Sequence, residues 1–380
     1  MRMNYDYDFF KWFRLESKVA FEDQRRTEIG GMGGWNITEA IFGMPNHPVY
    51  TPDGKFFAQG GWGNAVAQAK EGATASFNTR NINTNFKLIA DITKDLKLNL
   101  QAGINYQSAK DEDIAKPVPL YNWDGTLAYY GIANPEQGSL TLTNREAKYR
   151  NFTGYLEYNK RFGKHELNVM AGLAHEENDD SWFSAFRDHF VTEDLWSLNL
   201  GGTQNMKNDG GGTQWAISSA FSRASYSFDN KYLLEASLRY DGSSRFQKAT
   251  RWGLFPGISA AWRLSEENFM KGQRLFDDLK LRASYGQTGN QEGVGLYDYI
   301  QLLNISGPYP LGAGGQDQYA SLAGMVSLNR TWETLINRNV GVDATMLASR
   351  LNFSFDYFLK TNKDLLIPVT SFFRDPKIFE

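Results

Sequence analysis

The sequence predicts an all-β fold, an antiparallel transmembrane β-barrel of which the chain supplies roughly half the wall. Apolar and polar residues alternate in many separate runs, and the connections between these runs are alternately short and long. Aromatic residues make up 14% of the 380 residues, whereas the mean hydropathy is only −0.49. A strand that touches lipid with every second residue combines these properties, because only one of its two faces needs to be apolar.

The region from Lys231 to Gly289 shows the alternation most clearly. Its first run has an apolar face formed by Tyr232, Leu234, Ala236, Leu238 and Tyr240. The opposite face carries polar side chains, namely those of Glu235, Ser237 and Arg239. Successive strand side chains point to opposite faces of a sheet. Aromatic residues near the ends of the apolar face are typical of the girdles that flank the lipid-facing band of a membrane barrel.

Further alternating runs are spread along the whole chain. They include residues 15–23, 96–107, 152–162, 167–173, 224–228, 279–285 and 351–359. We expect strands of about 9 to 12 residues, which is long enough to cross a bilayer at a tilt. Counted in this way, the chain supplies roughly 12 strands, whereas a large plugged barrel closes with about 22.

The connections indicate which ends of the strands face outward. Tight polar turns join neighbouring runs at Lys94–Asp95, Gly163–Lys164, Asp229–Asn230 and Ser349–Arg350. Long segments lie between these hairpins, at Gln24–Ser76, Lys110–Lys148, Glu177–Gln214 and Gln287–Arg338. Two connections are of intermediate length, at Gly242–Thr250 and Ser265–Asp278. Short periplasmic turns and long extracellular loops are typical of outer-membrane barrels.

Three consecutive segments also carry a family resemblance. They read RYDGSSRF at Arg239–Phe246, FPGISAAWRLSEENFM at Phe255–Met270 and LKLRASYGQTGNQ at Leu279–Gln291. In this order they resemble the barrel of SusC/RagA-type TonB-linked (TonB-dependent) outer-membrane transporters. The resemblance extends more weakly from about Lys148 to Ile367.

The family motif singles out a set of candidate residues. We interpret them mainly as parts of the barrel wall, with contact to a substrate as the weaker alternative. They are Arg239, Asp241, Gly242, Ser243, Ser244, Arg245, Phe246, Arg282, Gly286, Gly289 and Asn290.

The resemblance implies a fold, a location and a function. Residues 1–380 would all belong to one transmembrane barrel domain, from which the plug domain and the C-terminal closing strands are absent. The protein would lie among lipids in the outer membrane of a Gram-negative cell and import oligosaccharides, other glycans or peptides. TonB would act through the plug, and a SusD-like lipoprotein would cover the extracellular mouth. The N-terminal residues 1–12 lack the apolar core of a signal peptide, so we expect an internal piece of an exported precursor.

Aromatic residues in the long polar segments are the best candidates for contact with a substrate or a partner protein. An aromatic ring can stack on a sugar or pack against another protein, although ordinary packing within a loop is at least as common. The candidates are Trp35, Trp62, Trp123, Tyr129, Tyr130, Trp182 and Trp196.

The sequence gives no support for several other classes of site. The net charge is −3 and no basic cluster indicates nucleic acid. Cysteine is absent, which excludes disulfides and thiolate metal ligands. The four histidines share no metal-ligand spacing, and no glycine-rich stretch is followed by the Lys-Ser/Thr of a phosphate loop. We therefore expect no metal, no cofactor and no catalytic residue.

Two alternatives to a transporter remain open from the sequence. A soluble or surface-exposed all-β carbohydrate-binding module would also be rich in aromatic residues, and it would dissolve without detergent. An outer-membrane barrel enzyme would need paired carboxylates in one cleft, and nothing in the sequence brings any two of the 43 acidic residues together.

Overall fold

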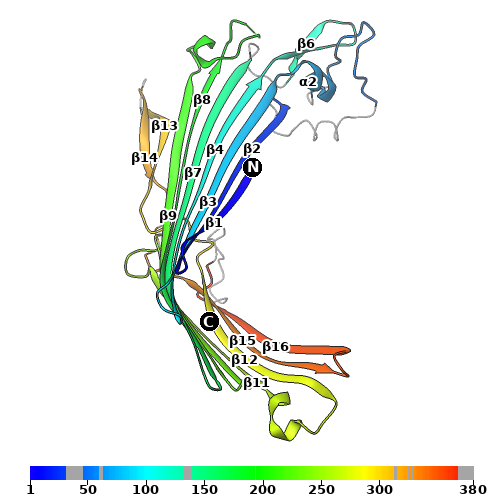
Figure 1. The fold of residues 1–380 in the computed structure, drawn as a ribbon. Helices are drawn as coiled ribbons and strands as arrows, with labels where there is room; N and C mark the ends of the chain where they lie inside the picture. The colour runs from blue at the N-terminus through cyan, green and yellow to red at the C-terminus, as the bar shows by residue number, and fades with distance from the viewer. Residues whose placement is uncertain are drawn as a thin grey trace, which may run out of the picture.

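The computed structural model describes residues 1–30, 46–59, 63–131, 138–192, 194–311, 315–323, 326 and 328–366. Its main element is one antiparallel sheet of 12 strands, as the sequence predicts. In spatial order these are β1 (Arg2–Phe10), β2 (Phe13–Ile29), β3 (Thr74–Asp91), β4 (Leu96–Ala115), β7 (Ser139–Phe162), β8 (His165–Asp188), β9 (Lys207–Phe228), β10 (Tyr232–Ser243), β11 (Trp252–Arg263), β12 (Phe276–Asn290), β15 (Glu333–Met346) and β16 (Leu351–Lys363). The sheet is strongly curved and open, with β1 and β16 at its two edges (Figure 1).

The connections keep the predicted alternation of short and long. β3 and β4, β7 and β8, and β9 and β10 are joined at one end of the sheet by turns of two to four residues. Asp229 and Asn230 both have positive φ angles, 52° and 57°, which is the backbone of the two-residue hairpin turn that Asn and Asp tolerate well. The long connections all leave from the opposite end, which we take as the extracellular end.

Smaller elements lie within the connections. The described extracellular ones are α2 (Ala65–Glu71), β5 (Val118–Tyr121), β6 (Leu127–Gly131), the 3-10 helix η1 (Leu198–Leu200), β13 (Leu303–Leu311) and β14 (Gly315–Leu322). Two 3-10 helices, η2 (Leu264–Glu266) and η3 (Asn268–Met270), form the longer turn between β11 and β12. Within the part of the chain that the structure describes, no helix has the length and apolar character needed to cross a bilayer.

The strands extend further than the sequence pattern predicts. β7 and β8 each have 24 residues, so much of Lys110–Lys148 and Glu177–Gln214 is strand and not loop. Above the bilayer both faces of a strand meet water, so the apolar alternation that marks a strand disappears while the backbone pairing continues. The first strand, β1, was also missed as a strand, although Tyr5 and Tyr7 alternate with aspartates there.

Strand register assigns one apolar and one polar face to the whole sheet. Leu88, Leu100, Gly154 and Leu173 are direct partners across β3, β4, β7 and β8, so they share the outer face. This face is apolar although it is exposed; Leu173, for example, is 66% exposed. Exposed apolar side chains in a continuous band are expected where lipid covers them.

The apolar band has the height of a bilayer core. On β7 it runs from Phe152 to Phe162, ten steps of about 3.3 Å, which a tilt of about 40° reduces to roughly 25 Å. Aromatic rings mark its periplasmic border. His165 and Phe228 lie 4.9 Å apart between ring centroids, Phe228 and Tyr232 lie 6.3 Å apart, and Tyr232 and Trp262 lie 6.3 Å apart.

Glu267, in the turn between η2 and η3, anchors this aromatic border. Its Oε1 accepts hydrogen bonds from the Tyr232 hydroxyl at 2.6 Å and from the Trp262 indole at 3.1 Å. The Nζ of Lys231 lies 3.6 Å from its other oxygen. The hydrogen bonds from Tyr232 and Trp262 lower the pKa of the Glu267 carboxyl below its ordinary value of 4.5.

We predict that Leu100→Arg destabilises the barrel by about 2–4 kcal/mol, because it places a cation on the lipid-facing side near mid-bilayer. Gln101→Arg should be tolerated, because the next residue of the strand faces the polar side. The measurement is urea unfolding of each variant refolded into lipid vesicles. Equal losses at both positions would contradict the assignment of the two faces.

We also predict that Glu267→Gln lowers the urea midpoint of the refolded barrel at pH 7. Because the folded-state pKa of Glu267 lies below 4.5, its stabilising effect is present above that pH and disappears as the pH falls through the folded-state value. The difference between wild type and variant should therefore shrink towards zero in acid. A difference that stays constant from pH 7 to about pH 3 would show that ionisation of this residue is not involved.

Candidate functional site

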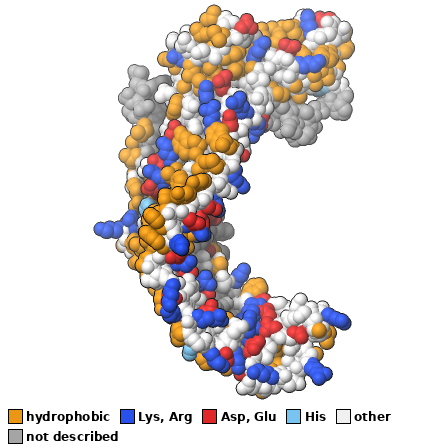
Figure 2. Space-filling model, viewed as in Figure 1, with side chains coloured by type: hydrophobic (Ala, Val, Ile, Leu, Met, Phe, Trp, Pro, Cys, Tyr) orange, Lys and Arg blue, Asp and Glu red, His pale blue; other side chains and the backbone are white. Residues whose placement is uncertain are grey.

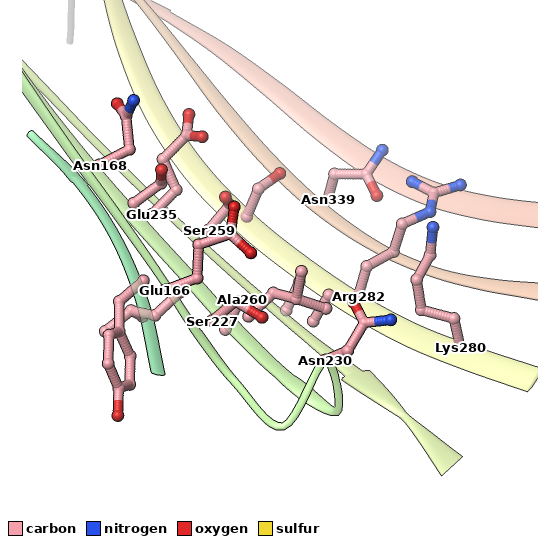
Figure 3. Close-up of a pocket in the computed structure, with 17 residues that line it drawn as sticks. Glu166, Asn168, Ser227, Asn230, Glu235, Ser259, Ala260, Lys280, Arg282 and Asn339 are labelled. Atoms are coloured by element: carbon pink, nitrogen blue, oxygen red, sulfur yellow. The ribbon is translucent and has the colours of Figure 1, made fainter. Parts of the chain in front are cut away.

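Among the described residues, the polar face of the sheet carries three sizeable hollows with side chains that can contact a solute. The one nearest the periplasmic turns has a volume of about 600 Å³ and is lined by β8 to β12 and β15. Glu166, Glu235, Lys280 and Arg282 supply its charged groups, and Asn168 is one of its amides. In Figure 3, Asn168, Glu235 and Arg282 rise from the same side of the curved sheet, although they come from three different strands.

Arg282 links three strands beside this hollow. Its guanidinium donates to both carboxylate oxygens of Asp356, at 2.5 and 2.6 Å, and to Asp343 at 3.1 Å. Lys280 pairs with the same Asp343 at 3.0 Å. Gly341 lies between Arg282 and Asp356 in the register, and a methyl group there would come within 2.7 Å of the guanidinium carbon. The missing side chain thus lets Arg282 reach across one strand, and Figure 2 shows charged side chains gathered here over β12, β15 and β16.

The second hollow is rich in asparagine amides, and Arg2 and Lys18 supply its charges. It has a volume of about 510 Å³ and includes Asn83, Asn85, Asn105 and Asn151 from β3, β4 and β7. Gly103 makes room for the Asn151 side chain, because an added Cβ would lie 2.2 Å from its Oδ1. That oxygen is buried and has no hydrogen-bond partner among the described residues. Amide groups can both donate to and accept from hydroxyl groups or peptide groups of a solute.

The third hollow lies on the polar face near the extracellular mouth and is the largest of the three, at about 870 Å³. It combines aromatic and charged side chains. The Arg26 guanidinium stacks over the ring of Phe77, 4.5 Å from its centroid. Arg145 Nε lies 3.9 Å from the Asp111 carboxylate, and Trp182 stands directly opposite Arg145 in the strand pairing. This arrangement offers a ring face together with both signs of charge.

Trp182 was expected in a loop, and this expectation was wrong. The residue lies within β8, on the polar face, and its side chain lines the hollow at the mouth. Gly211 on the neighbouring strand leaves space beside the ring, since a Cβ there would lie 3.3 Å from the indole nitrogen. The strand therefore holds the ring in a more defined position than a loop would.

The first half of the RYDGSSRF motif forms part of the inner wall. The Arg239 guanidinium donates to both oxygens of Asp241 at 2.8 Å and to the hydroxyl of Ser219 at 2.9 Å. Gly242 follows at the end of β10, where an added Cβ would come within 2.7 Å of the Trp252 indole. These contacts connect β9, β10 and β11 at the extracellular rim.

The second half of the motif ties two extracellular connections to the wall. Ser243 donates to the Gln291 side chain at 2.5 Å, and the Ser244 hydroxyl accepts from the Ala216 amide at 2.9 Å. Arg245 donates to the carbonyl of Val294 at 2.8 Å. Phe246 is 1% exposed and belongs to a buried cluster with Phe255, Val294 and Trp332.

The remaining motif positions on β12 differ in their surroundings. Gly289 faces the Phe255 ring, and an added Cβ would lie 2.2 Å from it. Asn290 donates to Glu333 at 3.3 Å. Gly286 has nothing within 4 Å of an added Cβ, so no packing contact explains the glycine at this position.

Two extracellular connections form a small packed unit above the mouth. Ala67, Val118 and Leu120 make its buried core, and Tyr129 packs against it. Trp123 is 58% exposed on this unit, and its ring meets Phe57 edge-on at 5.8 Å. The unit overhangs the hollow side of the sheet, where α2 and β6 are labelled in Figure 1.

The other candidate aromatic residues are placed differently. Tyr130 is partly exposed on β6. Trp196 packs against Phe190, 4.8 Å between ring centroids, next to a buried cluster, so packing accounts for it. Trp35 and Trp62 lie outside the described residues.

Sequence reasoning missed most of the residues that line the hollow at the mouth. Arg26, Asp111 and Arg145 fall in segments that were expected to be loops, and Phe77 directly follows one of them. Side chains in these segments still alternate between the two faces of a strand, but the two faces do not differ in polarity. Among the described residues, no three His, Cys, Asp or Glu side chains are grouped so that they could hold a metal ion.

Comparison with known proteins agrees with this geometry. A family model described as "TonB dependent receptor-like, beta-barrel" matches residues 20–375. The chain is 28% identical to TonB-dependent receptor P3 of Formosa agariphila over 96% of this chain and 36% of that protein. It is 28% identical to the TonB-dependent receptor SusC of Bacteroides thetaiotaomicron over 72% of this chain and 26% of that protein. It therefore spans about a third or less of the length of these relatives.

A solved structure shows the same fold. The RagAB peptide transporter matches with a TM-score of 0.81 at 22% identity, covering 96% of this chain and 40% of that chain. The predicted resemblance to SusC and RagA and the predicted location in the outer membrane are both confirmed. The chain belongs to the TonB-dependent receptor-like β-barrel family.

Proposed function

We propose that the chain forms part of the wall of a SusC-like importer that takes up oligosaccharides, other glycans or peptides across the outer membrane by a TonB-dependent route. The observation that carries this proposal is the sheet with two unlike faces. One face is an apolar band of bilayer height, and the other holds three polar hollows between mouth and periplasmic end. A wall that only anchored a protein in lipid would not need polar hollows on its inner side.

The three hollows suggest a path for the solute. At the mouth, the Trp182 ring and the nearby charges would make first contact. The amides around Asn83 and Asn105 would then exchange hydrogen bonds with hydroxyl or peptide groups as water is displaced. Near the periplasm, Arg282 is held by two carboxylates, so this part of the wall would stay rigid while its occupant moves.

The proposed partners are TonB and a SusD-like lipoprotein. The relatives are named TonB-dependent receptors, which supports coupling to TonB through a plug domain. The exposed Trp123 on the unit above the mouth would meet a lipoprotein that covers the opening. We further propose that residues 1–380 belong to a single barrel domain and that the motif residues Arg239–Phe246 mainly serve its architecture.

We propose no chemical step on the substrate. The relatives are receptors and transporters, which speaks against an enzyme at the level of the family. The alternative of a soluble carbohydrate-binding module is not favoured, because its sheet would bury the apolar face that is exposed here.

The function is tested by uptake in cells that make the complete receptor. Cells with and without the receptor gene are given labelled neutral oligosaccharides or labelled peptides, in the presence and absence of a proton-motive-force uncoupler. The proposal expects receptor-dependent accumulation of at least one of the two classes, abolished by the uncoupler. Accumulation that is the same without the gene for both classes would refute it.

We predict that Trp182→Ala weakens binding of the imported substrate. Loss of one stacked ring costs about 0.5–1.5 kcal/mol, or roughly two- to tenfold in affinity. The matched control is Phe183→Ala, which removes an aromatic ring from the next residue of the same strand but on the opposite face. Titration of the purified receptor with substrate measures both variants. Equal loss of affinity in the two variants would argue against a substrate contact at Trp182.

A further inference from the structure

The lipid-facing side of the sheet contains an apolar groove that the transport path does not use. It has a volume of about 530 Å³ and crosses β11, β12, β15 and β16. Its floor lies close to the sheet backbone because Ala260 and Ala283, two small residues, are direct partners in the strand pairing. Larger apolar side chains border it, among them Ile258, Val340 and Leu359. A groove of this kind on the lipid-facing side fits an acyl chain.

One end of the groove carries an arginine that faces lipid. Arg338 is the direct partner of Tyr285 and of Leu359, which places it on the outer face. Its guanidinium carbon lies 5.8 Å from the Tyr285 ring centroid, and its Nη1 donates to the Thr361 hydroxyl at 3.5 Å. Within the described ranges Arg338 forms no ion pair, whereas Arg282 on the inner face has two carboxylate partners.

An unpaired guanidinium is unfavourable beside hydrocarbon unless an anion compensates it. Arg338 lies towards the Glu333 end of β15, the end that leads into the long extracellular connection. Two residues nearer to the periplasm, Val340 already belongs to the apolar band and is 54% exposed. Arg338 is thus at the height where the acyl region gives way to headgroups. Tyrosine rings, here Tyr285 and Tyr357, are typical of this border.

We propose that this groove and Arg338 form a binding site for a phosphate-bearing lipid of the outer leaflet. The guanidinium would bind the headgroup phosphate through two parallel hydrogen bonds, for which its planar fork is suited. An acyl chain would lie over Ala260 and Ala283. The cation matches the phosphate of such a lipid, and the apolar groove matches its acyl chain. This site does not depend on the identity of the transported substrate.

Native mass spectrometry of the complete, delipidated receptor tests the proposal. Diphosphoryl lipid A is the probe, and the same lipid with its phosphates removed is the comparison. Wild type should retain the phosphorylated lipid, and Arg338→Gln should weaken its binding about tenfold, as expected for the loss of a charge-assisted contact. Ala283→Phe should also weaken binding, because it fills the groove while it keeps the charge.

The matched control is Arg161→Gln, which removes a cation from the polar face of β7 and should bind lipid A like wild type. Retention of the folded, heat-modifiable barrel on gels shows that each variant is intact. Equal binding of the phosphorylated lipid to wild type and Arg338→Gln would overturn the site. If wild type binds the phosphorylated and dephosphorylated lipids equally, the site does not recognise a lipid phosphate. Displacement of the lipid by millimolar inorganic phosphate alone would likewise overturn the proposal of a lipid-phosphate site.

Discussion

Continuous hydrogen bonding between neighbouring strands is the constraint on which the rest of the structure depends. Lipid offers no partner for a backbone amide or carbonyl, so each strand inside the bilayer must pair with its neighbours. Once β3 pairs with β4 so that Leu88 lies opposite Leu100, the faces of both strands are decided. A slip by one residue would turn the amides of β4 towards lipid and its leucines towards water. The difference in polarity between the two faces therefore stabilises the native register against such a slip.

This constraint explains how much of the fold could be predicted from the sequence. The alternation is visible in most strands that have one face towards lipid, and there the strands and the tight turns were predictable, although β1 was missed. It fades in the extensions of β4 and β7 beyond the bilayer, where residues such as Lys110 and Asn144 pair with each other but both faces meet water. Those segments were expected to be loops because the physical contrast that reveals a strand is missing there.

The candidate site was less predictable, because its contacts join residues from different strands. Arg282 lies in a motif, but its partners Asp343 and Asp356 lie 61 and 74 residues later in the chain. Only the register shows that Gly341 stands between Arg282 and Asp356 and leaves the space for their contact. Likewise, the sequence identified Trp182 as a candidate, but its position on the polar face follows from the pairing of β7 with β8.

Strands β12 and β15 each carry an arginine, and the two arginines lie in different surroundings. Arg282, on the polar face, is surrounded by carboxylates from two neighbouring strands, so the protein itself neutralises it. Arg338, on the outer face, has aromatic and apolar neighbours, and among the described residues its hydrogen-bond acceptor is a hydroxyl. A guanidinium with no carboxylate partner in the described part of the chain is stabilised by an anion from its surroundings, and at the border of a bilayer lipid phosphates supply one. The placement of acidic partners on each face of the sheet thus indicates what that face meets.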